Sequence, residues 1–259
     1  MKLRHALAGV AIALALTGTA QAGRTCEQRP PQAQAVTRGL ALAARVEQHL
    51  QQSGAQVVFL ARVGQDLSEY GQHYSHLGFA YRDGGFWRVA HKLNDCGSDR
   101  SAVYRQGIGE FFLDNPFDYE AGIAVPTEQV QAHLLAVLRD NQRLGQMHAP
   151  AYSMVAYPWS QRYQQSNQWV LETLAMAEEP AAIDRARAQA WLKLRGYEPA
   201  VLHLSTLKRL GARVTSANIA FDDHPDGQRY RGRIATVTAD SVFLWLARSG
   251  LASRPTAIR

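Results

Sequence analysis

The chain has 259 residues, of which 46% are hydrophobic and 19% charged, with 20 glycines and 10 prolines. This mixture excludes collagen-like, low-complexity and disordered classes and is typical of a folded globular chain. The formal net charge of +6 comes from basic residues that are scattered without a cluster of five or more, so we expect no nucleic acid partner.

The first 22 residues have the pattern of a secretory signal peptide. Lys2 and Arg4 precede an apolar run from Ala6 to Leu16, and Ala20-Gln21-Ala22 supplies small residues for cleavage. The apolar run is too short to cross a bilayer of about 30 Å, and no later stretch supplies about 20 uninterrupted apolar residues. We therefore expect an exported protein, periplasmic or secreted, that begins at Gly23 and has no transmembrane segment.

Cys26 and Cys96 are the only cysteines of the chain. Because an exported protein folds in an oxidising compartment, we expect one disulfide that joins the N-terminal region to the middle of the chain. By loop-closure entropy, such a bridge would stabilise the fold by about 4 kcal/mol. The alternative is a free Cys96 that acts as a nucleophile beside His91.

The next part of the chain predicts one helix and three strands. Apolar residues recur at helical spacing from Val36 to Gln52, and a glycine follows. Gln56 to Val63 is rich in β-forming residues and predicts a buried strand. His76 to Arg82 and Phe86 to Leu93 predict the two strands of a hairpin, because Asp83-Gly84 between them is typical of a type I′ turn.

Beyond this hairpin the pattern predicts mostly helices, after an irregular stretch from Gly107 to Val125. No internal repeat and no clear linker interrupts the chain, so we expect residues 23–259 to form a single α+β domain. The predicted elements are a helix over Thr127–Leu144 with Thr127 as its cap, a strand over Tyr152–Tyr157, helices over Ser166–Ala177, Pro180–Arg195 and His203–Leu210, and a strand over Arg233–Thr238.

Two histidines are predicted to lie side by side in the hairpin. With the expected turn, His76 lies opposite His91, on the face that also carries Gly78 and Ala80. These small neighbours leave room for another group to pack there. A turn one residue later would instead place Lys92 opposite His76. On spacing alone, an ordinary surface or core pair is the simpler interpretation of the two histidines.

Ser166 is expected in the first turn of a helix that continues through Trp169 and Val170. Unsatisfied backbone N–H groups and the positive end of the helix dipole stabilise an anion that develops there, so a serine in this place is a candidate nucleophile. The alternative is that Ser166 is a plain helix cap, because serine is among the favoured N-cap residues.

The motifs occur in a particular order along the chain. Ser75-His76-Leu77-Gly78-Phe79 comes first, His91 follows on the next predicted strand, and Gln165-Ser166-x-x-Trp169-Val170 comes much later. This order resembles that of the circularly permuted papain-like proteins of the NlpC superfamily, in which a histidine strand precedes a nucleophile helix. The whole chain also resembles an exported bacterial family of unknown function, domain-of-unknown-function family 2145.

The resemblance implies both a fold and a set of roles. The fold would be a permuted papain-like core, an antiparallel sheet packed on helices, with extra C-terminal helices. His76 would be the general base, His91 the partner that orients it, and Ser166 would stand where the family has a cysteine. A thiol has a pKa of about 8.5, whereas an alcohol needs a base to remove its proton during attack. The same substitution is expected in a relative that has lost its nucleophile.

Two functions of different classes follow. The first is a hydrolase or acyltransferase that acts on amide or ester bonds of cell-wall peptide or lipid-linked material through Ser166, His76 and His91. The second is a catalytically inactive envelope binding or scaffold protein, in which aromatic side chains such as Tyr157 and Trp159 stack on a peptide or glycan. Core packing is the alternative role of these rings and of Tyr163.

A metal site built from His73, His76 and His91 is a third, weaker possibility. His73 and His76 are three residues apart, a spacing that converges on a helix but points to opposite faces on a strand. We therefore expect no metal, and the motifs imply no cofactor.

Overall fold

The structure is a computed structural model that describes residues 32–113 and 116–259. The expected signal peptide and Cys26 lie outside these residues. The signal peptide and the bridge from Cys26 to Cys96 therefore remain predictions.

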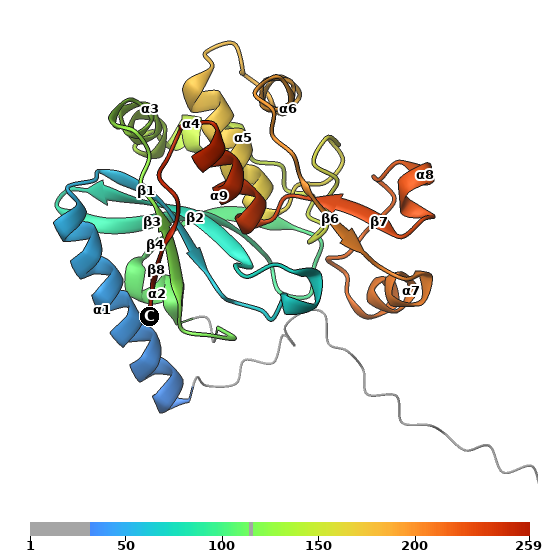
Figure 1. The fold of residues 1–259 in the computed structure, drawn as a ribbon, viewed down its shortest axis with the longest axis horizontal. Coiled ribbons are helices and arrows are strands. Elements are labelled where there is room, and N and C mark those ends of the chain that lie inside the picture. The colour runs from blue at the N-terminus through green and yellow to red at the C-terminus, as the bar shows by residue number, and fades with distance from the viewer. Residues whose placement is uncertain (1–31, 114–115) are drawn as a thin grey trace, which may run out of the picture.

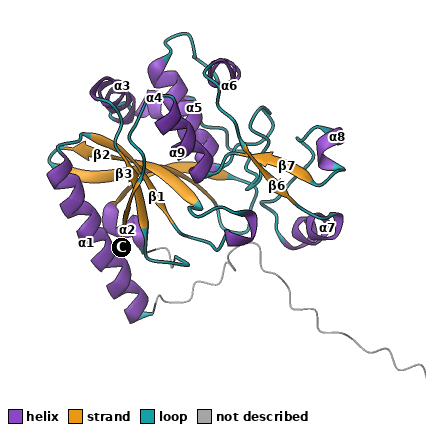
Figure 2. Cartoon of the chain, in the orientation of Figure 1, coloured by secondary structure: helices purple, strands orange, loops and turns teal. Residues whose placement is uncertain are grey.

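Over the described residues the fold is mixed α+β (Figures 1 and 2). Its main sheet has six antiparallel strands in the order β4-β3-β2-β1-β5-β8, and β6 and β7 form a second, two-stranded sheet. The strands are β1 Val57–Arg62, β2 His76–Asp83, β3 Phe86–Asn94, β4 Ser101–Gly107, β5 Ala121–Ala124, β6 Ala200–His203, β7 Arg233–Thr236 and β8 Thr256–Ile258.

Helices cover both faces of the main sheet (Figure 1). α1 and α2 pack on one face, whereas α3, α5 and α9 pack on the other. The helices are α1 Ala33–Ser53, α2 Ile108–Phe112, α3 Glu128–Leu138, α4 Asn141–Gln146, α5 Ser166–Glu178, α6 Arg185–Leu194, α7 Thr206–Thr215, α8 Asp226–Arg229 and α9 Ala239–Arg248, with a short 3₁₀ turn at Ser68–Tyr70.

The two covered faces explain why β1 is an uninterrupted apolar run. Val57 and Phe59 belong to the core cluster under α3, α5 and α9, whereas Val58 and Leu60 belong to the cluster under α1 and α2. Because successive strand residues point to opposite faces, a strand buried on both sides needs apolar residues at every position.

Several predicted elements are confirmed. α1 ends where Gly54 adopts a φ of 68°, a left-handed conformation that glycine takes without strain. Thr127 caps α3 by accepting a hydrogen bond from the backbone N–H of Val130. The predicted helix over Thr127–Leu144 is divided into α3 and α4, because the Asp140 side chain accepts from two backbone N–H groups and begins a new helix.

The predicted hairpin turn is wrong. Gly84 and Gly85 form it, with φ values of 56° and 94°, and Asp83 stays in β2, paired with Phe86. A type I′ turn requires positive φ at both central residues, and two glycines meet that requirement with less strain than Asp83-Gly84 does.

The new turn shifts the register of β2 and β3 by two residues. Arg82 pairs with Trp87 instead of Gly85, so His91 lies beside Gly78 and not directly opposite His76. A shift of two residues keeps every side chain on its predicted face. The alternative that placed Lys92 opposite His76 is also wrong, because Lys92 points toward the α5 side of the sheet.

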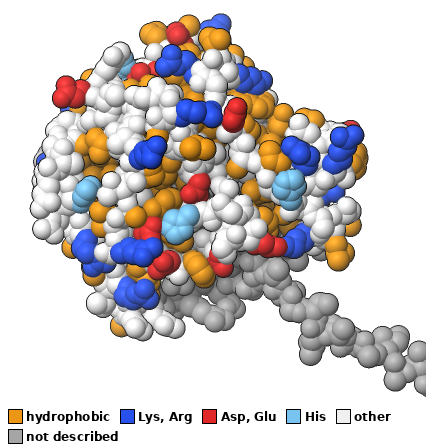
Figure 3. All heavy atoms as spheres, in the orientation of Figure 1, with side chains coloured by type: hydrophobic (Ala, Val, Ile, Leu, Met, Phe, Trp, Pro, Cys, Tyr) orange, Lys and Arg blue, Asp and Glu red, His pale blue; other side chains and the backbone are white. Residues whose placement is uncertain are grey.

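Other differences lie in segments without a clear period. Residues 152–157 form a loop and not a strand, and the stretch over Gly107–Val125 contains α2 and β5. The expected extra C-terminal helices are present, but they are interleaved with β6 and β7, and β8 returns to pair with β5. No helix in the described part of the chain has the length and apolar character that a membrane crossing needs. Lys and Arg side chains are dispersed over the face in Figure 3.

Candidate functional site

His76 and His91 meet on the face of the sheet that α2 covers. Nε2 of His76 lies 2.8 Å from Nδ1 of His91. Both rings pack against Phe111 of α2, with ring centroids 5.8 and 5.2 Å away. His76 is partly exposed, whereas the side chain of His91 is completely buried. The sequence therefore predicted correctly that the two side chains share a face and meet, but their direct cross-strand pairing is wrong, because they are diagonal neighbours in the hairpin.

The surroundings of His91 keep its imidazole neutral. Burial lowers the pKa of His91 to about 4, the charge of Arg62 acts in the same direction, and a hydrogen bond to Gln106 opposes them. The Arg62 guanidinium donates to the carbonyl of Phe111 and lies 4.8 Å from the centre of that ring. Arg62 thus contributes positive charge to the layer that holds both histidines.

The hydrogen bonds around the pair define which nitrogen carries each proton. Nε2 of Gln106 donates to Glu110 over 2.9 Å, so Oε1 of Gln106 accepts from Nε2–H of His91 over 2.7 Å. A neutral imidazole has one donor and one acceptor, so Nδ1 of His91 accepts from Nε2–H of His76. The proton of a neutral His76 ring is therefore on Nε2.

Ser166 is the first residue of α5 and is buried, with 5% of its surface exposed. The helix cap is Gln165, whose side chain accepts from the backbone N–H of Asn167, so the interpretation of Ser166 as the cap is wrong. Burial raises the pKa of Tyr152, an effect that the neighbouring Ser166 side chain opposes.

The structure places Ser166 and the histidines on different faces of the sheet. Oδ1 of Asn167 accepts from the backbone N–H of Leu77, so α5 begins near the same end of β2 as His76. Leu77 points into the core beneath α5, and His76, one residue earlier, points toward α2. No hydrogen bond joins Ser166 to either histidine within the residues that the structure describes.

A buried lysine lies on the α5 side of the sheet, which the sequence analysis did not single out as a site. Nζ of Lys92 donates to the carbonyl of Ala149 over 2.8 Å and to Oε1 of Gln164 over 2.7 Å. Burial lowers the pKa of Lys92 to about 6, Arg185 adds to this effect, and Glu172 opposes it. A single lysine in the apolar strand β3 was the signal that could have identified it.

Glu172 of α5 is the centre of a buried polar network. Arg185 forms two hydrogen bonds to its carboxylate, at 2.7 and 3.2 Å, and also donates to three backbone carbonyls of the loop before α5. Gln164, Gln168 and Gln189 donate to the same carboxylate. This network holds the loop over residues 147–165 against α5, which is a structural role.

Gln106 and Glu110, which continue the hydrogen bonds from His76 and His91, were not predicted. Gln106 lies on β4, whose sequence Ser-Ala-Val-Tyr-Arg-Gln-Gly mixes polar and apolar residues on both faces. Glu110 lies in α2, a helix of five residues that is too short for a periodic signal. Their role follows only from the register of β3 and β4.

The aromatic residues that were considered for ligand stacking already have partners within the chain. Trp159 packs against Tyr197, with ring centroids 6.1 Å apart, and Nζ of Lys193 lies 4.8 Å from its centre. Tyr157 contacts His224, and Tyr163 contacts Arg162. All three of these aromatic side chains are partly buried, so each packs within the chain and also keeps part of its surface exposed.

The weaker metal hypothesis receives no geometric support. His73 bonds to Glu120 over 2.8 Å, while His76 bonds to His91. Among the described residues, no group of three or more histidine, cysteine, aspartate or glutamate side chains is arranged to hold a metal ion.

Comparisons with known proteins identify a family but no activity. No curated protein matches the chain. The crystal structure of the metalloprotein yiiX from Escherichia coli O157:H7, DUF1105, is similar, with 12% sequence identity over 79% of this chain and 96% of that chain. Its TM-score of 0.43 is too low to support an argument. The family described as "Uncharacterized protein conserved in bacteria (DUF2145)" matches residues 49–246, which is most of the chain. The chain therefore belongs to the DUF2145 family.

Proposed function

We propose that this chain is an exported envelope protein with a permuted papain-like core that binds cell-wall peptide or glycan and does not use Ser166 as a nucleophile. The position of Ser166 carries the proposal. Ser166 begins α5, which packs on one face of the sheet, whereas His76 and His91 pack against Phe111 of α2 on the other. A serine nucleophile is expected within hydrogen-bond reach of its base, and the placement of Ser166 and the histidines on different faces of the sheet supports a function that does not use them as a triad.

The arrangement of β2, β3 and α5 supports the papain-like part of the proposal. The strand with His76 pairs with the strand that carries His91, and α5 packs on the same sheet with Trp169 against Phe79. The histidine strand precedes the helix that begins at Ser166, which is the order that the resemblance implies.

A hydrolase or acyltransferase remains the second candidate, and the hydrogen-bonded chain from Glu110 to His76 favours it. These hydrogen bonds place the proton of a neutral His76 ring on Nε2 and hold the imidazole in one orientation, as a general base requires. Catalysis would need α5 to move so that Ser166 reaches His76.

Labelling with a serine-directed phosphonate distinguishes the two candidates. We expect the folded chain to form no adduct at Ser166, as measured by intact mass and peptide mapping. Ser153 is a matched control, because it is also buried, and its hydroxyl is bonded to Ala220. An adduct at Ser166 that disappears in Ser166→Ala and in His76→Gln, but not in Ser153→Ala, would establish the hydrolase instead.

The binding half of the proposal is tested by co-sedimentation with purified peptidoglycan. We expect the wild-type chain and Ser166→Ala to sediment equally, because Ser166 takes no part in the proposed binding. If neither protein sediments with peptidoglycan, the proposed ligand class is wrong.

A further inference from the structure

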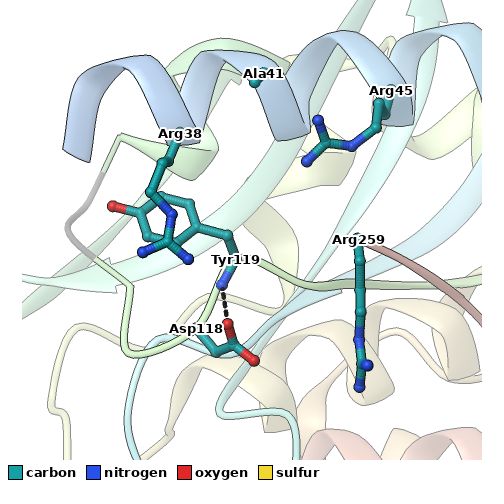
Figure 4. Close-up of a pocket in the computed structure, with 6 residues that line it drawn as sticks. All are labelled: Arg38, Ala41, Arg45, Asp118, Tyr119 and Arg259. Carbon is teal, nitrogen blue, oxygen red and sulfur yellow. Dashed lines mark hydrogen bonds between the residues drawn. The ribbon is translucent and has the colours of Figure 1, made fainter. Parts of the chain in front are cut away.

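A hollow of about 370 Å³ lies between α1 and the chain before β5 (Figure 4). Arg38, Ala41 and Arg45 of α1 form one wall, because residues three to four apart share a face of a helix. The small side chain of Ala41 leaves space between the two arginines. We call this feature the arginine hollow; its lining residues are Arg38, Ala41, Arg45, Asp118, Tyr119 and Arg259.

The opposite wall of the arginine hollow is held in place by contacts within the chain. The guanidinium carbon of Arg38 lies 4.0 Å from the centre of the Tyr119 ring. Figure 4 shows the two side chains stacked in this way. The Tyr119 hydroxyl donates to the carbonyl of Ala35 on α1, and the Tyr119 backbone N–H donates to Asp118. Tyr119 therefore fixes the position of Arg38, which reduces the entropy that a ligand must remove on binding.

Positive charge in the arginine hollow exceeds negative charge. Within the described part of the chain, no carboxylate pairs with Arg38 or Arg45, and Asp118 is the one carboxylate among the lining residues. Arg259 bonds through Nε to Glu120 over 2.6 Å, a buried carboxylate that also accepts from His73 and Tyr74. Glu120 thus anchors Arg259 at the rim.

A second arginine-lined hollow provides a contrast. It lies beside Tyr81 and contains Arg88, Arg105 and Arg139. Arg88 pairs with a carboxylate, while Arg105 and Arg139 donate to backbone carbonyls. The arginines of the second hollow therefore already have partners in the protein, whereas Arg38 and Arg45 present donors to solvent.

We propose that the arginine hollow binds a phosphoryl group, carried either by a free phosphate ester or by a lipid headgroup. Two guanidinium groups without carboxylate partners can neutralise the dianion of a phosphate monoester or the single negative charge of a phosphodiester headgroup, and the planar fork of arginine suits the phosphoryl oxygens. This site is separate from Ser166 and the histidine pair, so it stands or fails independently of the proposed function.

Isothermal titration calorimetry of the purified chain with glycerol 3-phosphate tests the proposal. We expect saturable binding that weakens with added salt and that Arg45→Gln reduces about tenfold or more. Arg139→Gln, from the second hollow, is the matched control and should bind as the wild type does. Ser166→Ala should also retain binding.

A second arm identifies the source of the phosphoryl group. The chain is mixed with phosphatidylcholine vesicles that contain or lack phosphatidylglycerol. Binding to the vesicles with phosphatidylglycerol that is lost in Arg45→Gln assigns the site to a headgroup, whereas binding of glycerol 3-phosphate alone assigns it to a free ester. The proposal is overturned if neither probe binds, or if Arg45→Gln and Arg139→Gln reduce binding equally.

Discussion

A neutral histidine has one hydrogen-bond donor and one acceptor, and His91 uses both in a completely buried position. Its Nε2 donates to Gln106 and its Nδ1 accepts from His76. Protonation of His91 would place a second proton between the two rings and a charge beside Arg62. The neutral form of His91 is thus built into the folded state.

His91 should therefore make the fold sensitive to acid. The unfolded chain takes up a proton at His91 near its ordinary pKa of 6.5, and the folded chain only near pH 4, so stability falls as the pH decreases between these values. From pH 7 to 4.5, the wild type should lose about 2 to 3 kcal/mol more than His91→Gln in urea unfolding. His203→Gln, at an exposed histidine, should behave as the wild type. Equal losses in all three proteins would refute a neutral His91.

Lys92 leads to a second pH dependence. Its pKa is about 6 in the folded chain and 10.5 ordinarily, so the unfolded chain binds the extra proton between these values and stability increases with pH. From pH 7 to 9, the unfolding free energy of the wild type should rise by about 1 kcal/mol per pH unit more than that of Lys92→Met. Lys193→Met, at an exposed lysine, is the control and should keep the wild-type slope. If the unfolding free energy of Lys92→Met rises with pH as steeply as that of the wild type, Lys92 is charged in the folded chain.

Sequence reasoning found His76, His91 and Ser166 but not the groups that give them their properties. His76 and His91 were identified because they share a hairpin, where contacts follow from local spacing. Gln106, Glu110 and Lys92 acquire their partners from β4, α2 and the loop before α5, and no local pattern encodes those contacts.

At the scale of elements, the hairpin between β2 and β3 depends on glycine. Gly85 has a φ of 94°, which a residue with a side chain adopts only with strain, whereas Gly145 lies within α4 with open space at its Cβ position. Gly85→Ala should destabilise the fold by about 1 to 2 kcal/mol. Gly145→Ala should stabilise it by about 0.5 to 1 kcal/mol. Thermal unfolding measures both changes, and a stabilising Gly85→Ala would contradict the observed turn.

The elements that sequence predicted best are those with a strong period or a clear end signal. α1, β1 and α5 combine an apolar pattern with burial, and the structure confirms them. The exact hairpin register could not be predicted, because Asp83-Gly84 and Gly84-Gly85 are both typical of tight turns. The loop over residues 147–165 is held by side-chain bonds to Gln164 and Arg185, which have no periodic signature.

At the scale of the whole molecule, the main sheet separates two packed layers. Both the histidine strand and the helix with Ser166 were predicted, yet His76 and His91 pack against Phe111 in the layer of α2, whereas α5 lies in the other layer. Which face α5 covers is decided by the apolar residues of β2 that it packs on, including Phe79. This relation joins residues about 90 positions apart in the chain, and sequence spacing alone does not define it.

The most direct test of the account is the alkylation rate of the thiol that Ser166→Cys introduces, measured against pH with peptide mapping to exclude Cys26 and Cys96. A buried thiol at the start of α5 and away from His76 should react slowly, and adding His76→Gln should leave its pH profile unchanged. Rapid alkylation near neutral pH that His76→Gln abolishes would show a thiolate paired with imidazolium. That result would contradict the separation of position 166 from the histidines.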